Sequence, residues 1–198
     1  TSQPLVLTFG AATKLALKTE AAGFVNRTNF APQPIVQIED DYGNVVTTRT
    51  DAITVSLSGA TLTGADSDGT KTINAELGEA AFTGLGVQGK VTEAKKKLTF
   101  TAFGLTSVEQ EFTLLHGAAT HVTLEVSTTA GSGDVLSKQP IVRVLDADEN
   151  PVITGADSTR TATISIDAAS VSAGVELGGT KTLQASAGVA DFAGKDLK

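Results

Sequence analysis

Gly10-Ala11-Ala12-Thr13, followed by apolar residues at every second position, returns later in the chain as Gly117-Ala118-Ala119-Thr120 with the same alternation after it. A period of two is the pattern of a half-buried β-strand. Gly117 lies 107 residues after Gly10, which is about the length of one small domain. The sequence therefore predicts a tandem array of one repeated domain rather than an enzyme built around a single cleft.

Further landmarks keep the same order in both copies. They are Pro34-Ile35-Val36 against Pro140-Ile141-Val142, Gly69-Thr70-Lys71-Thr72 against Gly179-Thr180-Lys181-Thr182, and Gly78 with Phe82 against Gly188 with Phe192. Because the offset changes by only a few residues between landmarks, we expect the insertions to be short and to lie in loops.

The alignment of the copies predicts three segments. Residues 10–116 form a complete domain, and residues 117–198 form a second domain that lacks its final strands. Residues 1–9 align with the end of the first copy, so they are predicted to be the last strand of a preceding domain. We expect the chain to be a segment of a longer polypeptide. The alternative is that the N-terminal strand completes the incomplete domain of a neighbouring molecule by strand addition.

Alternating β-branched and apolar segments, separated by turn residues such as those of 41–44 and 67–69, occur about seven times per copy, as in an immunoglobulin-like sandwich. The alternating segments of the first copy contain Leu15 and Leu17, Ile35 to Ile38, Ile53 to Leu57, Ile73, Phe82, Leu98 to Ala102, and Phe112 with Leu114. No stretch has a helical period. The predicted fold class is all-β: tandem immunoglobulin-like β-sandwiches of about seven strands each, arranged end to end.

The amino-acid composition limits which partners the chain can bind and in which cellular compartment it is expected. Fifteen basic residues stand against 22 acidic residues, giving a net charge of −7, so we expect no nucleic-acid partner. The chain has no Cys, Met or Trp, which excludes disulfides and thiolate metal sites and resembles the composition of secreted bacterial surface proteins. No apolar run approaches the roughly 20 residues of a membrane span, so no membrane insertion is predicted for this segment.

The shared motifs resemble the bacterial Ig-like repeats of large surface proteins. They are Gly-Ala-Ala-Thr-x-Leu, Gln-Pro-Ile-Val-x-(Ile/Val)-x-Asp, Gly-Thr-Lys-Thr, Gly-x-Ala-x-Phe and Leu-Thr-Phe-Thr-Ala-x-Gly-Leu. More distantly, they are similar to the repeats of invasin- and intimin-type adhesins and to the Ig-like domains of S-layer proteins. The resemblance implies an extracellular, cell-surface location. It implies no catalytic residue and no particular ligand for this chain.

A polar loop follows the second predicted strand in each copy. Asp146, Asp148 and Asn150 alternate in the second copy, and carboxylate and amide oxygens in this arrangement are candidate Ca²⁺ ligands. The first copy offers Asp40 and Asn44 as the corresponding candidates. The alternative is a tight turn that uses Asp, Gly and Asn for their backbone preferences, and the turn is the favoured interpretation.

Other polar residues carry weaker signals. Asp66 and Asp68 near Gly69 form a second calcium candidate with the same alternative. His116 and His121 lack a shared carboxylate in the sequence, so we interpret them as surface or junction residues. No nucleophile elbow and no phosphate-binding loop occurs, and we predict that the chain is not an enzyme.

The junction between the copies is short, which predicts little independent tumbling and a semi-rigid rod. The leading functional prediction is a structural segment of a bacterial cell-surface adhesin or stalk. The first alternative is an S-layer, sheath or filament subunit that self-assembles, and the second is an accessory module of a secreted polysaccharide-active enzyme. The expected partners are neighbouring Ig-like domains of the same chain and, for a lattice or filament, copies of the chain itself.

Overall fold

The computed structural model describes residues 8–126, 131, 133–167, 169 and 176–198, and in this part of the chain it contains fifteen β-strands and no α-helix. All strand pairs within the sheets are antiparallel, which confirms the predicted all-β class. The chain divides into two compact units, residues 1–115 (unit 1) and 116–198 (unit 2). Residues 1–7, most of the segment predicted to be a preceding domain's last strand, lie outside the described residues.

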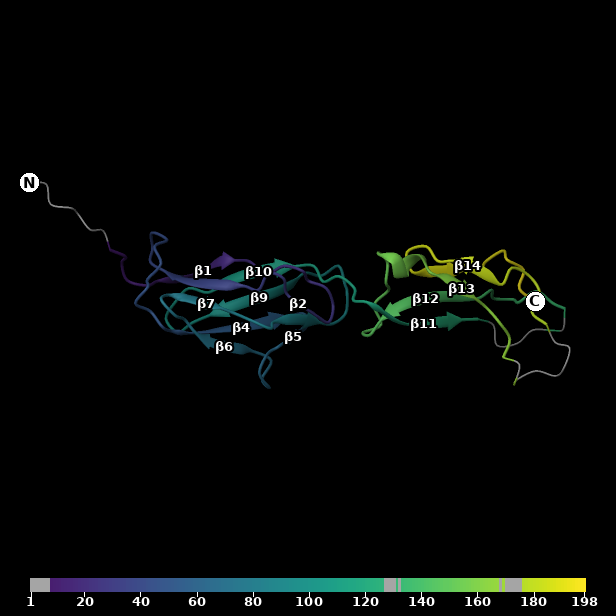
Figure 1. Cartoon of the computed structure of the whole chain (residues 1–198), viewed down its shortest axis with the longest axis horizontal. Helices are drawn as coiled ribbons and strands as arrows, with labels where there is room; N and C mark the ends of the chain where they lie inside the picture. The colour runs from purple at the N-terminus through teal and green to yellow at the C-terminus, as the bar shows by residue number, and fades with distance from the viewer. Residues whose placement is uncertain (1–7, 127–130, 132, 168, 170–175) are drawn as a thin grey trace, which may run out of the picture. The chain divides into compact units, whose positions relative to one another are not determined.

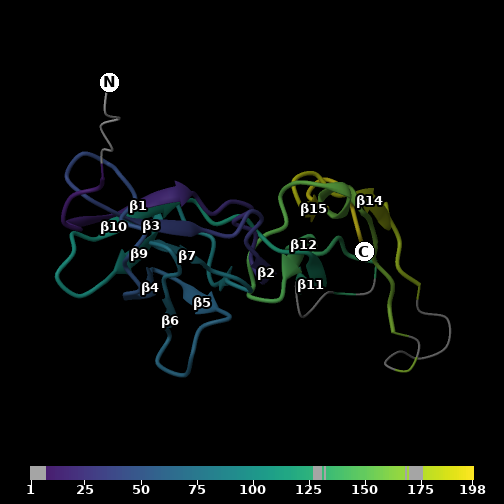
Figure 2. The same cartoon turned by 60° about the vertical axis from the view of Figure 1, so that its left-hand side comes forward.

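Unit 1 contains three sheets, and all of their strands except β8 are labelled in Figures 1 and 2. Its ten strands are β1 (Lys14–Thr19), β2 (Thr28–Asn29), β3 (Ile35–Glu39), β4 (Ala52–Ser58), β5 (Thr61–Thr63), β6 (Lys71–Asn74), β7 (Glu79–Ala81), β8 (Gly86–Gln88), β9 (Lys96–Thr101) and β10 (Val108–Phe112). The sheet orders are β1-β3-β7, β10-β9-β4-β6 and β2-β8-β5.

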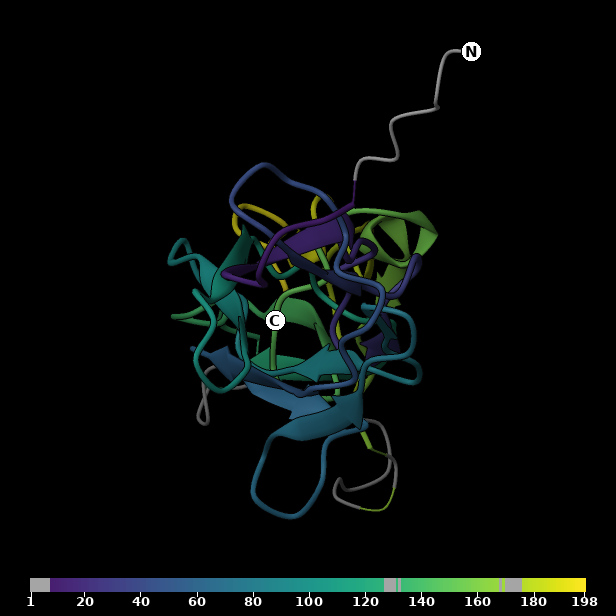
Figure 3. The ribbon, with the colours of Figure 1, turned by 90° about the vertical axis from the view of Figure 1, so that its left-hand side faces the viewer.

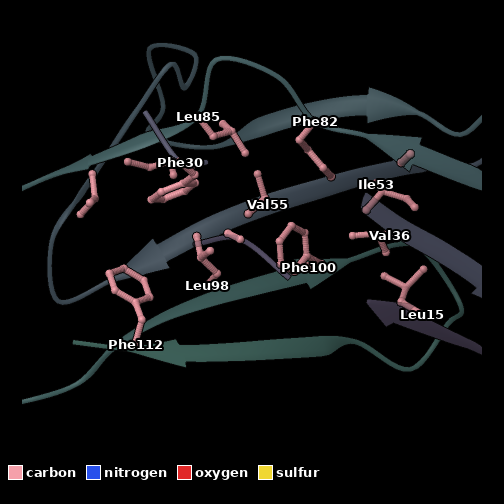
Figure 4. Close-up of a cluster of buried hydrophobic side chains, with 14 of the residues drawn as sticks. Leu15, Phe30, Val36, Ile53, Val55, Phe82, Leu85, Leu98, Phe100 and Phe112 are labelled. Atoms are coloured by element: carbon pink, nitrogen blue, oxygen red, sulfur yellow. The ribbon is translucent and has the colours of Figure 1, made fainter. Parts of the chain in front are cut away.

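The first two sheets share one hydrophobic core. Alternation along the strands sends every second side chain inward, so that Val36 of β3 and Ile53 of β4 are both fully buried in the same cluster. Figure 4 shows side chains from both sheets pointing toward one another, with Phe82 and Phe100 at the centre. The two ring centroids lie 5.5 Å apart. Most of the alternating apolar residues predicted in the first copy lie in or against this core, whereas Ile35 is half-buried outside it.

The third sheet consists of strands of only two or three residues, and its Leu62 and Val87 belong to the core of unit 1. It depends on Gly86, because a Cβ at that position would lie 2.3 Å from the carbonyl oxygen of Thr28 and 2.6 Å from the hydroxyl of Thr63. Glycine at this position lets β8 lie between β2 and β5. The connection between β5 and β6, residues 64–70, projects away from the sheets (Figures 2 and 3).

Unit 2 repeats part of this arrangement. Its elements are β11 (Ala119–Glu125), β12 (Ile141–Asp146), the short 3₁₀ helix η1 (Ala156–Thr159), β13 (Thr161–Thr163), β14 (Thr182–Gln184) and β15 (Val189–Asp191). The sheet β11-β12-β15 corresponds to β1-β3-β7, and β13-β14 corresponds to β4-β6. Even the cross-strand threonine pair is kept, because Thr54 bonds Thr72 in unit 1 and Thr163 bonds Thr182 in unit 2.

One difference between the units is large. Leu15 of β1 is 4% exposed, whereas Val122, at the same register position of β11, is 60% exposed. Leu124 of β11 is 55% exposed, whereas its counterpart Leu17 is partly buried against the core. In unit 1, β9 and β10 pack over these positions of β1. The described part of unit 2 contains no strands that correspond to β9 and β10, so the side chains of Val122 and Leu124 stay exposed.

Candidate functional site

The residues 40–44 that follow β3 form a loop (the Asp40 loop) organised by one carboxylate. Oδ1 of Asp40 accepts hydrogen bonds from the backbone N–H groups of Tyr42 and Asn44, at 3.0 and 2.9 Å. Oδ2 accepts the N–H of Gly10, at 2.7 Å, and the side-chain amide of Asn44 donates to both oxygens. A residue 2% exposed thereby ties its own turn to the segment that precedes β1.

The Asp146 loop, residues 146–150 after β12, has the same construction. Oδ1 of Asp146 accepts the N–H groups of Asp148 and Asn150 at 2.9 and 3.0 Å, and Oδ2 accepts the N–H of Gly117 at 2.8 Å. The amide of Asn150 donates to Oδ2 at 3.0 Å. Glu149 has a φ of 59°, in the left-handed region, where the first loop has Gly43 with a φ of 82°. The two loops therefore share one backbone conformation despite different residues.

The electrostatics of the first loop follow from these bonds. The hydrogen bond from the Asn44 side chain and then that from the Gly10 N–H lower the pKa of Asp40 to about 2, because both favour the ionised carboxylate. The charge is held by oriented N–H groups rather than by a cationic side chain. The carboxylate thus acts as a structural acceptor for the backbone.

The predicted calcium ligands are accordingly brought together in pairs. Asp40 lies against Asn44, and Asp146 lies against Asn150, in each case with the asparagine nitrogen directed at the carboxylate. Asp148 takes part through its backbone N–H. Within the described residues no group of three or more His, Cys, Asp or Glu side chains is placed to hold a metal ion. Calcium binding stays a prediction, and it would have to displace donors that already occupy the carboxylate oxygens.

A second repeated polar contact is made by the glutamine that precedes Pro-Ile-Val in each copy, Gln33 in unit 1 and Gln139 in unit 2. In unit 1, Nε2 of Gln33 donates to the carbonyl oxygens of Phe30 and Leu85, both at 2.8 Å. Oε1 of Gln33 accepts the N–H of Leu85 at 3.0 Å. One side chain therefore joins the segment before β3 to the segment before β8.

Unit 2 contains the same contact. Nε2 of Gln139 donates to the carbonyl oxygens of Leu136 and Leu197, both at 3.2 Å, and Oε1 accepts the N–H of Leu197 at 3.1 Å. The glutamines were part of the repeated motif, but alternation could not reveal their role. Their signal was a polar residue kept at the same place in both copies.

The remaining candidates form local contacts. Nε2 of His116 bonds the hydroxyl of Thr154 at 2.8 Å, and His121 faces the carboxylate of Glu149 at 3.0 Å. In the loop 64–70, Asp68 accepts the N–H and hydroxyl of its neighbour Thr70, which lower the pKa of its carboxyl group. The two histidines therefore contact different residues of unit 2, His116 the hydroxyl of Thr154 and His121 the carboxylate of Glu149.

Comparison with known proteins adds no family. A scan against protein-family models finds no match for this chain. A search of curated proteins also finds no match. Among the described residues, no helix has the length and apolar character needed to cross a membrane.

Proposed function

We propose that the chain is a structural, non-catalytic segment of a bacterial cell-surface adhesin or stalk, in which repeated immunoglobulin-like domains act as a semi-rigid spacer. Support comes from the repeated motifs, the antiparallel sheets that share one core in unit 1, and the polar residues that the two copies have in common. Those polar residues hold backbone segments in place in both units. Such contacts stabilise a repeated module and need no substrate.

The observation that carries the spacer proposal is the way each unit holds the chain at their junction. Leu115 donates its N–H to Phe24 and accepts the N–H of Asn26, so the last residue of unit 1 is bonded within unit 1. Gly117 is bonded to Asp146 within unit 2. The intervening His116 is bonded to Thr154 of unit 2 through its ring.

No residue of the junction is therefore left as a free linker. Each unbonded residue in a flexible linker increases its reach and its orientational freedom. A junction without unbonded residues therefore restricts the reach and the relative orientation of the domains that it joins. The expected consequence is a narrow range of relative orientations, which is what a spacer requires.

Pulsed electron paramagnetic resonance tests this proposal directly. The chain contains no Cys, so Thr48→Cys in unit 1 and Ser165→Cys in unit 2 place one spin label on each unit at exposed residues. We expect a narrow distance distribution. A Gly-Ser-Gly-Ser insertion between Leu115 and His116 should broaden it several-fold, and Asp146→Ala should broaden it to a smaller extent. A native distribution as broad as that of the insertion variant would contradict the spacer proposal.

Sedimentation across a range of concentrations separates the spacer from the self-assembling alternative. A stalk segment is expected to stay monomeric. Ordered, concentration-dependent sheets or filaments would instead favour an S-layer, sheath or filament subunit.

A further inference from the structure

Unit 2 contains an open groove of about 460 Å³ between its two sheets (the groove), lined mainly by apolar side chains together with Thr120, His121, Arg160, Thr161 and Thr163. The groove is bordered on one side by Val122 and Leu124 of β11 and on the other by Ala162 of β13 and by Ile164. Val142 and Ala190 form part of its base. All of these residues belong to unit 2.

In unit 1, the position that corresponds to the groove is occupied by β9 and β10. There β9 pairs with β4 and β10 pairs with β9, which places the side chains of Leu98, Phe100 and Phe112 in the core. The segment between them also reaches β1, because Leu15 donates its N–H to the carbonyl oxygen of Thr106 at 2.8 Å. The hairpin formed by residues 96–112 therefore covers β1 and extends the sheet beyond β4.

The register of the two units permits a residue-by-residue comparison. Val122 pairs with Val144 as Leu15 pairs with Ile38. Similarly, Ala162 pairs with Leu183 as Ile53 pairs with Ile73. In the described part of unit 2, β13 pairs on one side only, with β14. The side on which β4 carries β9 is therefore open, and it borders the groove.

We propose that the groove is the docking site for a β-hairpin with the sequence pattern of residues 96–112. One strand of the hairpin adds to the free edge of β13 in antiparallel register, and the other covers β11. Its inward residues have the character of Leu98, Phe100 and Phe112, and its outward residues are Thr, Lys and Glu. This is recognition by strand addition, in which backbone hydrogen bonds supply affinity and alternate side-chain pockets supply specificity.

Two features of the groove fit this occupant. Phe100 packs against Phe82 in unit 1, and Phe192 stands at the position of Phe82 in unit 2, buried and in contact with the base of the groove. In addition, Val55 pairs with Phe100, so Ile164, which follows β13 at the position of Val55, is placed to receive the same aromatic residue. The groove thus presents apolar contacts at the positions where the hairpin carries its largest side chains.

The test uses the whole chain and a synthetic peptide of residues 95–113. We expect the peptide to shift the amide resonances of Val122, Leu124 and Ile164, and to leave those of Leu15, Leu17 and Val55 unchanged, because the corresponding place in unit 1 is filled. A matched peptide carries Leu98→Thr, Thr99→Leu, Phe100→Thr and Thr101→Phe. It keeps the composition but moves the apolar face by one residue, so it should not bind.

Variants of the chain and of the peptide complete the test. Val122→Lys places a charge in the groove at an exposed position and should abolish binding, whereas Thr123→Lys, on the opposite face of β11, should not. Phe100→Ala in the peptide should weaken binding at least about tenfold. Equal binding of both peptides, or no binding of either, would overturn the proposal. So would a dimer of the chain alone that Val122→Lys dissociates and Thr123→Lys does not, because it would assign the groove to a second copy.

Discussion

Replacing Gln33 with alanine is expected to destabilise unit 1 by about 3 kcal/mol, since the side chain makes three hydrogen bonds and each contributes about 1 kcal/mol net. The substitution also leaves the N–H of the fully buried Leu85 without its acceptor, which adds to the cost. For a domain of about 100 residues, 3 kcal/mol corresponds to a decrease in Tm of roughly 12–24 °C.

The assay is equilibrium unfolding in urea. Amide resonances of buried residues such as Leu85 and Phe100 report on unit 1. Amide resonances report on unit 2, which should unfold at the same urea concentration as in the native chain. Gln33→Met keeps the length of the side chain but not its hydrogen bonds, so it should be destabilised nearly as much as Gln33→Ala.

Gln37→Ala is the matched control. Gln37 is also a half-buried glutamine of the same segment, but its side chain makes a single hydrogen bond, to the carboxylate of Glu79. Its removal should cost about 1.5 kcal/mol, half the effect expected at Gln33. If Gln33→Ala and Gln37→Ala lowered the stability of unit 1 equally, the inference that Gln33 joins two backbone segments would be refuted.

Three further outcomes are expected. The pKa of Asp40 falls from an ordinary 3.8 to about 2 in the folded chain, so its stabilising contribution is present above pH 3.8 and is lost as the pH falls toward 2. The urea midpoint of unit 1 should decrease over that interval, and Asp40→Asn, but not Asp41→Asn, should reduce the decrease. Millimolar Ca²⁺ should leave Tm unchanged relative to chelator, because N–H donors occupy the carboxylate oxygens; a calcium-dependent rise would restore the metal prediction. Gly78→Ala should destabilise unit 1 by about 2 kcal/mol or more in denaturant titration, because a left-handed φ is combined with a Cβ 2.7 Å from a backbone oxygen. Gly104→Ala, with a similar φ but open space around the Cβ, should cost only about 1 kcal/mol.

The sequence was sufficient to predict the all-β class and most of the inward positions of the first copy, because these depend on alternation within one strand. It did not predict the small sheet of β2, β5 and β8, whose strands of two or three residues are too short to show a period. The sequence also did not predict that the apolar side chains of β11 are exposed. Val122 repeats the alternation of Leu15, but whether it is covered depends on strands distant in the sequence.

For the candidate loops, too, the sequence predicted the local structure but not the contact with a distant segment. Asp40 and Asn44 could be identified as a polar turn from their residue types. The partner of Asp40 that is distant in the sequence could not, since Gly10 contributes a backbone N–H, and every non-proline residue carries one. Only the fold, by bringing the loop after β3 beside the segment before β1, selects which N–H the carboxylate receives.

The bond between Asp146 and Gly117 has a mechanical consequence. Gly117 is the second residue of unit 2, so tension transmitted along the polypeptide from unit 1 reaches this N–H before it reaches the first ladder bond of β11. On the other side, the same tension acts on Leu115, which two backbone hydrogen bonds hold within unit 1. The Asp146 carboxylate therefore stands in the load path after the contact of His116 with Thr154 and before the ladder bonds of β11, and the force at which unit 2 begins to yield is set in part by a side chain at the end of β12.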